Sequence, residues 1–382
     1  MKNLILVLNS GSSSLKFSLF NWQLKKLVSG NLERIGLVDS FLGYQAGRKQ
    51  QVFKFKKIKD HSQALQKVID LEEIPLAKIK IVGHRVVTGG PKFTETVKVS
   101  KSVFVQLKKN DSLAPLHNPP NMMGLAASFR ILPQAKNVAV FDTSFHRTLP
   151  EQAYTYGLPK KINDKFKIRR YGFHGISHQY VAGQAAQKLK KPLKQTNLIT
   201  CHLGNGCSIC AVRQGKSVDT SMGFTPLEGL VMGTRCGDID PAIVTFLLKK
   251  LRLSPEKIDQ LLNKKSGVLG ISGISNDLRE ILVASGIKVK GYQAKRKFSL
   301  RQKKNAKLAL NIYIYRIKKY ISAYYGILGK VDAIVFTAGT GERNPDIRKM
   351  VMKDLPFAKK VKVMAIPTNE ELLIAQEAKK HA

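Results

Sequence analysis

The sequence predicts an α/β protein built from two domains. Short apolar runs typical of strands alternate along the chain with segments of helical periodicity, which is the pattern of α/β folds. The 382 residues exceed the usual size of one compact unit. Apolar residues make up 43% and charged residues 24% of the chain, so a disordered or low-complexity protein is excluded.

Two β-hairpins are predicted, each with a polar or glycine-rich tip. Residues 4–20 contain two strand patterns joined by the turn 9–14, which is rich in serine and contains one glycine. Residues 197–212 contain two more, joined by the turn 204–206. Because each hairpin begins an α/β block, the pair suggests an internal duplication.

Periodicity and capping residues predict the helices, and apolar runs predict further buried strands. The helices are expected at 61–74, 121–132, 177–190 and 241–250, from Ser254 onward, and at 300–328 and 370–380. The strands are expected at 79–82, 138–141, 333–336 and 361–366. A domain boundary is expected near residue 150, where Leu149-Pro150 opens a loop.

The chain is strongly basic, with 65 Lys and Arg against 26 Asp and Glu and a formal net charge of +39. Such a balance often indicates nucleic-acid binding. Here the lysines are spread in twos and threes, and aromatic residues do not alternate with base-reading residues as they do in nucleic-acid modules. We therefore expect no nucleic-acid partner, although a positive field would help to collect small phosphate-bearing anions.

The cysteines and the N-terminus predict a cytoplasmic protein. Cys207 and Cys210 have CxxC spacing, but Cys201 and Cys236 do not form the second pair that a zinc site needs. Four thiols in a chain of this length fit a reducing compartment. The apolar run at residues 4–8 is too short for a signal peptide, and no stretch approaches the ~20 apolar residues of a membrane span.

Three glycine-containing turns follow predicted strands, at 9–14, 202–206 and 337–342. Backbone N–H groups and hydroxyls in such turns can surround an oxyanion, and Lys16 could add charge to the first. Each turn alone is equally compatible with an ordinary polar loop. Together they indicate an extended ligand such as a nucleotide, because ligands bind beyond strand ends in α/β sheets.

Charged residues also follow strands or lie among glycines: His84-Arg85, Asp142, His174, and Arg235 with Asp238 and Asp240. Taken singly, each is more often a structural ion pair or cap than a functional group. Taken together, they suit phosphoryl transfer, which needs fixed positive groups for the phosphoryl oxygens and a carboxylate that orders metal-bound water or substrate.

Ten motifs in order resemble the acetate kinases of the acetokinase family, within the actin and sugar-kinase superfamily. The motifs are NSGSSSLKF at 9–17, GHRVVTGG at 83–90, APLHNPPN at 114–121, FDTSFH at 141–146, YGFHGISH at 171–178, HLGNGCS at 202–208, DTSMGFTPLEGLVMGTRCGDIDP at 219–241, SGISNDLRE at 272–280, FTAGTGE at 336–342 and TNEE at 368–371. The resemblance implies two actin-like (ribonuclease H-like) domains with a nucleotide cleft between them. The first would span 1–148, with helix 371–382 crossing back to it, and the second 149–370. It also implies a homodimer, to which the long helix 300–328 could contribute.

The resemblance assigns roles to individual residues. The implied catalytic residues are Arg85, His117, Asp142, His174 and Arg235. Asn9 and Glu370 match the family's magnesium positions. The implied pocket for the substrate methyl group, beside Arg85, consists of Val87, Leu116, Phe173 and Pro226. The implied nucleotide-binding residues, with Lys16 added from the turn argument, are His202, Leu203, Gly204, Asn205, Gly206, Asp277, Leu278, Arg279, Gly339, Thr340, Gly341, Glu342 and Arg343. Four positions depart from the family's usual residues: Thr88, Ile176, Cys207 and Arg343.

The implied activity is reversible phosphoryl transfer between ATP and acetate, giving acetyl phosphate and ADP, with Mg²⁺, or Mn²⁺ in its place, as the metal. Acetate is ionised near pH 7 because carboxylic pKa values lie around 4, so the nucleophile needs no general base. Asp142 is then better suited to orienting metal-bound water or a neighbouring arginine than to proton transfer. Glu370 can alternatively be a helix N-terminal acid. The alternative functions are a propionate or butyrate kinase on the same scaffold, and a catalytically idle nucleotide- or RNA-binding protein.

Overall fold

The computed structural model describes residues 3–111, 118–294 and 296–382. The chain forms two compact units, one of residues Met1–Arg147 with Asn369–Ala382, and one of residues Thr148–Thr368. The domain boundaries expected from the sequence lie one residue later at the first junction and two residues later at the second. Glu370 therefore belongs to the first unit.

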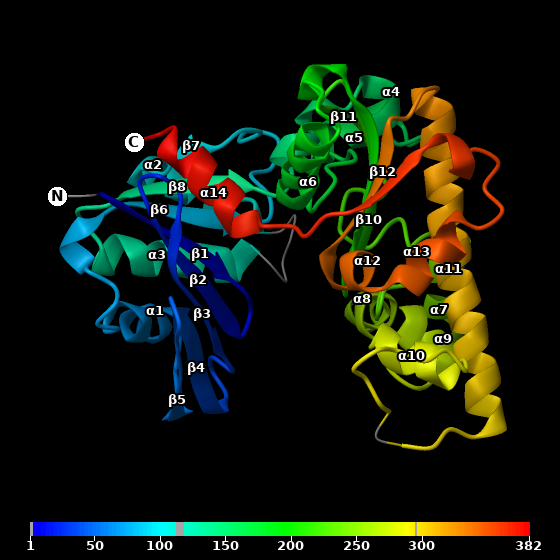
Figure 1. The fold of residues 1–382 in the computed structure, drawn as a ribbon, viewed down its shortest axis with the longest axis horizontal. Helices are drawn as coiled ribbons and strands as arrows, with labels where there is room; N and C mark the ends of the chain where they lie inside the picture. The colour runs from blue at the N-terminus through cyan, green and yellow to red at the C-terminus, as the bar shows by residue number, and fades with distance from the viewer. Residues whose placement is uncertain (1–2, 112–117, 295) are drawn as a thin grey trace. The chain divides into compact units, whose positions relative to one another are not determined.

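Among its described residues, the first unit contains one eight-stranded sheet and four α-helices, which Figure 1 labels. Its strands are β1 Leu4–Ser10, β2 Ser14–Asn21, β3 Lys26–Glu33, β4 Val38–Ala46, β5 Lys49–Lys57, β6 Ile79–Val86, β7 Val97–Lys98 and β8 Lys136–Phe141. Its helices are α1 His61–Ile69, α2 Lys101–Lys108, α3 Asn118–Ile131 and α14 Glu370–Lys379. The strand order is β5-β4-β3-β2-β1-β6-β8-β7, and α14 packs on β1, β6 and β8.

The second unit contains a five-stranded sheet in the order β11-β10-β9-β12-β13. Its strands are β9 Asn197–Leu203, β10 Cys207–Arg213, β11 Lys216–Thr220, β12 Ala333–Thr337 and β13 Lys362–Ala365. Its helices are α4 Glu151–Tyr154, α5 Lys160–Phe166, α6 Gly175–Lys188, α7 Pro241–Leu251, α8 Pro255–Lys264, α9 Gly267–Ser272, α10 Leu278–Ala284, α11 Leu300–Leu328, α12 Ala338–Arg343 and α13 Pro345–Met352. Helix α6 packs against β9 and β12, and α11 packs against β9 and β10.

The two sheets share one topology. In the first unit, β3, β2 and β1 are antiparallel neighbours, and β1, β6 and β8 are parallel neighbours. In the second, β11, β10 and β9 repeat the antiparallel part, and β9, β12 and β13 repeat the parallel part. This repeated order agrees with the duplication expected from the two hairpins. The whole is a mixed α/β fold, as the sequence predicted.

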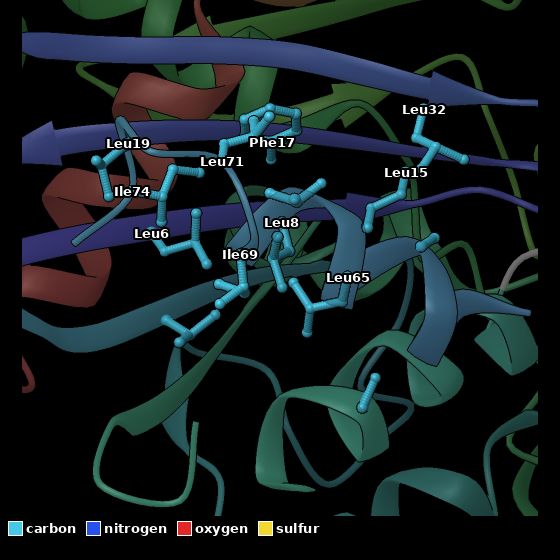
Figure 2. Packing of buried hydrophobic residues seen from close by; sticks show 14 of the residues in the cluster. Leu6, Leu8, Leu15, Phe17, Leu19, Leu32, Leu65, Ile69, Leu71 and Ile74 are labelled. Atoms are coloured by element: carbon cyan, nitrogen blue, oxygen red, sulfur yellow. The ribbon is translucent and has the colours of Figure 1, made fainter. Parts of the chain in front are cut away.

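The core of the first unit lies between the sheet and helices α1 and α3. Leu6 and Leu8 alternate with residues of the opposite face of β1, and they meet Leu65 and Ile69 of α1 (Figure 2). The alternation of side chains along the strand and their spacing along the helix thus place these apolar residues on the two facing sides of one interface. Each fully buried leucine or isoleucine side chain contributes roughly 1.5–3 kcal/mol relative to an exposed one. This interface holds β1, and with it the polar turn at residues 9–14, in a fixed place.

Several sequence predictions of secondary structure are confirmed, and three are wrong. Helix α11 has the predicted bounds and begins with a capping box between Ser299 and Gln302. Helix α1 ends at Ile69, because residues 71–74 continue the apolar pattern as a buried turn rather than as helix. Helix α3 begins at Asn118, since prolines in a first helical turn lose no intrahelical hydrogen bond. The turn predicted at 337–342 is largely replaced by the short helix α12, which spans Ala338–Arg343. In the described part of the chain, no helix is both long and apolar enough to cross a membrane.

Candidate active site

Three predicted site residues of the first unit meet where parallel strands end. Asn9 is next to last in β1, Arg85 is next to last in β6, and Asp142 directly follows β8. Since β1, β6 and β8 are parallel neighbours, their carboxyl ends share one sheet edge. Arg85 Nη2 lies 2.5 Å from Asp142 Oδ2, its Nε donates to Asp142 Oδ1 at 3.2 Å, and its Nη1 donates to Asn9 Oδ1 at 3.3 Å. Arg85 is therefore oriented by a carboxylate and an amide at once.

Glu370 adds a carboxylate to the same group. Burial alone would lower the pKa of Arg85, but Asp142 and then Glu370 outweigh it, so the pKa is raised above its ordinary value. For Glu370 itself, burial raises the pKa to about 7, against the opposing effect of Arg85. Glu370 occupies the first turn of α14, whose N-cap is Asn369. Packing of α14 on the sheet thus brings residue 370 to residues 9, 85 and 142.

The donor set of this group fits Mg²⁺ bound partly through water and phosphate. Among the described residues, no three or more His, Cys, Asp or Glu side chains are placed to hold a metal ion by themselves. Mg²⁺ usually keeps several waters and takes one or two protein carboxylates together with substrate phosphates. Glu370 and the amide oxygen of Asn9 meet that requirement, whereas an all-protein metal cage does not form among the described residues.

His84, which precedes Arg85, does not belong to this group. Neighbouring strand residues point to opposite faces of a sheet, and His84 is 2% exposed. Its Nε2 donates to Asn137 Oδ1 at 2.7 Å, and the same oxygen accepts from Ser128 Oγ at 2.6 Å. Burial lowers the pKa of His84 to about 4. His84 is a neutral structural histidine.

This histidine should make the fold sensitive to acid. The unfolded chain binds a proton at residue 84 near pH 6.5, whereas the folded protein binds it only near pH 4. The free energy of unfolding should therefore fall as the pH is lowered from 6.5 to 4, by at most about 3 kcal/mol from this group. His84→Gln keeps a donor for Asn137 but does not titrate. In urea unfolding at pH 7.5, 5.5 and 4.5, the free energy of unfolding should fall less steeply with pH in the variant than in the wild type. An equal fall in both proteins would contradict the description of His84 as a buried neutral histidine.

In the second unit, three histidines gather around Ser208. His174 Nδ1 lies 3.0 Å from Ser208 Oγ, and His178 Nε2 lies 2.7 Å from the same oxygen. The rings of His174 and His202 stack with centroids 4.1 Å apart. His174 precedes α6 with φ of +55°, a conformation that costs energy outside glycine and that concentrates at functional sites. Sequence analysis missed His178, although its spacing of four from His174 places both on one side of a helix start.

Arg235 and His174 meet beside Gly206. A Cβ atom on Gly206 would lie 3.3 Å from both Arg235 Nη1 and His174 Cε1, so only glycine leaves these groups their present space. Arg235 Nη1 donates to the carbonyl oxygen of Pro226 at 3.2 Å. Among the described residues Arg235 makes no ion pair, and burial lowers its pKa. A half-buried cation without a carboxylate partner is suited to receive an anionic ligand.

The loop that carries Pro226 and Arg235 is held by a polar network. Glu228 accepts from Arg170 Nη2 at 2.5 Å and from the Tyr156 hydroxyl. Asp238 accepts from Gly229 N at 2.8 Å and from Tyr320 Oη at 2.7 Å. Asp238, one of the sequence candidates, therefore supports the loop. Arg170 and Glu228 were missed because the sequence does not show that they pair.

The second unit also contains a cavity of about 730 Å³, within the range of small-molecule sites. Eight predicted nucleotide residues line it, namely Gly204, Asn205, Asp277, Leu278, Arg279, Gly339, Thr340 and Arg343. The other predicted members of this unit, which the lining does not include, are His202, Leu203, Gly206, Gly341 and Glu342. Asp277 caps α10 and holds the Arg279 guanidinium, with Nη2 to Oδ2 at 2.6 Å. The predicted nucleotide segments thus come together largely around one space.

The remaining predicted residues are distributed as follows. His117 and Leu116 lie outside the described residues. Lys16 is exposed on β2, and Val87, 5% exposed, follows β6, both in the first unit. Phe173, 3% exposed, and Pro226 belong to the second unit.

Of the residues that depart from the family pattern, Arg343 lines the cavity, and Cys207 lies behind two lining residues, Gly204 and Tyr313. The Cys207 thiol is buried, donates to the Gly204 carbonyl at 3.3 Å and lies 3.6 Å from Tyr313 Oη. Burial raises the pKa of this thiol to about 11, so it is a packing residue rather than a nucleophile. Arg343 pairs with Glu342 at 3.1 Å and is 81% exposed, so its guanidinium stays accessible at the cavity edge.

The chain is similar to known proteins along nearly its whole length. Residues 4–358 match the model of the acetokinase family. An acetate kinase of Caldicellulosiruptor saccharolyticus is 45% identical and one of Thermoanaerobacter pseudethanolicus 47% identical, each over 98% of both chains. The crystal structure of Porphyromonas gingivalis acetate kinase superposes with a TM-score of 0.88 at 38% identity, and that of a Francisella tularensis propionate kinase with 0.89 at 39%, each covering 99% of both chains. With the family model matched along most of its length and relatives matched nearly end to end, the chain belongs to the acetokinase family of kinases.

Proposed function

We propose that the protein transfers a phosphoryl group reversibly between ATP and acetate, giving acetyl phosphate and ADP. The observation that carries this proposal is Arg235, a half-buried cation that makes no ion pair among the described residues, placed with His174 at Gly206 beside the cavity. The names of the similar proteins support acetate as the acceptor. The pair of Arg85 and Asp142, with Asn9 and Glu370, would supply the remaining charged groups.

The main obstacle in this reaction is repulsion between two anions. The acetate carboxylate attacks the terminal phosphorus in line with the departing ADP, and negative charge spreads over the phosphoryl oxygens. Arg85 and Arg235 would bind these oxygens, and His174 would donate a hydrogen bond to one of them. Asp142 would hold Arg85 in orientation, a role that their ion pair supports. Mg²⁺, held by Asn9 and Glu370 partly through water, would neutralise phosphate charge when bound.

A close alternative is that the acceptor is the larger acid propionate, since a Francisella tularensis propionate kinase is 39% identical to this chain. The residues proposed to contact the methyl group are Val87, Phe173 and Pro226. The test is a coupled kinase assay with acetate, propionate and butyrate as acceptors. Highest kcat/KM for acetate is expected. A higher kcat/KM for propionate would make propionate the proposed acceptor in place of acetate. Absence of turnover with all three acids would support a catalytically idle nucleotide-binding protein.

Enlarging the proposed methyl pocket should favour propionate. Val87→Ala removes two methyl groups from a buried side chain, and one methylene in such a pocket is worth about 1–3 kcal/mol. The ratio of kcat/KM for propionate over acetate should rise by about tenfold. Val105→Ala, at an exposed position of α2, is the matched control. If this ratio is unchanged in Val87→Ala, Val87 does not line the pocket.

We also propose a cytoplasmic homodimer. Helix α11 exposes Leu308, Tyr315 and Ile327 to solvent, an apolar content that supports burial against a second copy. Light scattering of the purified protein would give its mass directly, and a monomer at micromolar concentration would contradict the dimer.

A further inference from the structure

A turn outside the family motifs contributes to the wall of the cavity. Tyr292 N donates to the Val289 carbonyl at 3.1 Å, which closes a turn over residues 289–292. Gly291, the third residue of this turn, has φ of +73°, a value that glycine adopts without steric cost. All four residues line the cavity. The turn therefore fixes the backbone position from which the Tyr292 side chain extends.

The segment after the turn is attached to the helix that carries the predicted nucleotide residues. Arg296 Nε donates to Glu280 Oε1 at 2.8 Å, and its Nη2 donates to the carbonyl oxygen of Ile274 at 2.8 Å. Glu280 lies in the first turn of α10, next to Arg279. Arg296 is thus joined to α10 by an ion pair, and the turn at 289–292 shares the cavity lining with α10.

Tyr292 and Arg279 form a cation–π pair in this wall. The guanidinium carbon of Arg279 lies 4.9 Å from the centroid of the Tyr292 ring. Asp277 holds the same guanidinium through its Nε at 3.0 Å and its Nη2 at 2.6 Å. An arginine fixed in this way over an aromatic ring is a surface on which planar, electron-rich groups stack.

The rest of the lining has a polar part near Arg235 and an apolar part near this pair. Asn205 and Gly233 lie together, since a Cβ on Gly233 would come 2.4 Å from Asn205 Oδ1. Asn205 is followed by Gly206, beside Arg235 and His174, so phosphates belong at that part of the cavity. The apolar side chains of Leu282 and Val289 line the cavity with Tyr292. We propose that Tyr292, together with Arg279, is the stacking surface for the nucleotide base and favours purines over the smaller pyrimidines.

This inference rests on the proposed kinase function for its nucleotide, so its test measures binding without turnover. Isothermal titration calorimetry would give Kd for ADP and for CDP, with no acetate present. The variants are Tyr292→Ala, Tyr292→Leu, which keeps apolar bulk without a ring, and Tyr292→Phe, which keeps the ring. Phe298→Ala, an aromatic residue of the same segment that lies outside the cavity lining, is the matched control.

Tyr292→Ala and Tyr292→Leu should each raise Kd for ADP by about tenfold, the effect of losing one base–aromatic contact, and should reduce the preference for ADP over CDP. Tyr292→Phe and Phe298→Ala should bind as the wild type does. In the kinase assay, KM for ATP should rise in the first two variants while KM for acetate stays unchanged. Unchanged Kd for ADP in folded Tyr292→Leu overturns the inference. If the wild type binds ADP but does not phosphorylate acetate, the proposed function is rejected. The comparison of Kd among the Tyr292 variants still tests the inference in that case.

Discussion

Removal of either active-site arginine should lower kcat by about 10³-fold or more, the size of effect known for phosphoryl-binding arginines. Arg235 and Arg85 should nevertheless differ in their effect on stability. Arg235 is half-buried and has no carboxylate partner in the part of the chain that the structure describes. Arg235→Ala therefore removes an uncompensated charge and should leave the melting temperature unchanged or higher. In the proposed reaction, a phosphoryl group would neutralise this unfavourable charge during turnover.

Arg85→Ala should lose stability together with activity. It leaves the Asp142 carboxylate, 2% exposed, without its partner, and breaking a buried pair from one side costs about 3–5 kcal/mol. Measurement of kcat and thermal unfolding on the same samples separates the two arginines, with Arg301→Ala, at an exposed position of α11, as control. Near-wild-type kcat in folded Arg235→Ala would reject its assignment to phosphoryl binding.

Glu370→Ala should nearly abolish activity and raise the Mg²⁺ concentration needed for half-maximal rate. The carboxylate would be lost from the proposed metal site, whereas Asn9→Ala should act in the same direction more weakly because it removes no charge. Burial raises the pKa of Glu370 to about 7, so the free energy of unfolding falls as the pH rises from 4.5 to 7 and this acid ionises. At pH 8 the variant should therefore be as stable as the wild type or more stable.

The competing explanation of Glu370 is stabilisation of the helix N-terminus, and Asn369 provides the control. The Asn369 side chain accepts from Leu372 N at 3.1 Å and caps α14. Asn369→Ala should lower stability by about 1 kcal/mol and keep kcat. Glu370→Ala should instead lower kcat and keep or raise the stability at pH 8. A Glu370→Ala protein with a lowered melting temperature and retained, Mg²⁺-independent kcat would make Glu370 a helix-terminal acid and leave the metal proposal without its main ligand.

The sequence by itself determined those parts of the molecule that depend on residues close together in the chain. The hairpin tips at 9–14 and 204–206, the capping of α8 by Ser254 and the position of Arg85 at the end of a strand all follow from local conformational preferences and alternation. These act over a few residues and are therefore visible in one sequence. The residue roles came from motif resemblance, which adds information that periodicity does not contain.

Only the tertiary structure decided which distant residues meet. Arg85 pairs with Asp142 across 57 positions, Glu228 with Arg170 across 58, and α14 brings Glu370 to the first sheet from the other end of the chain. It also decided that His84 turns into the core while Arg85 turns to the sheet edge, and that Tyr292 reaches the cavity through a turn with no motif of its own. The physical reason is that burial and charge pairing act between surfaces brought together by folding. A residue's own neighbours in the sequence do not specify what will cover it.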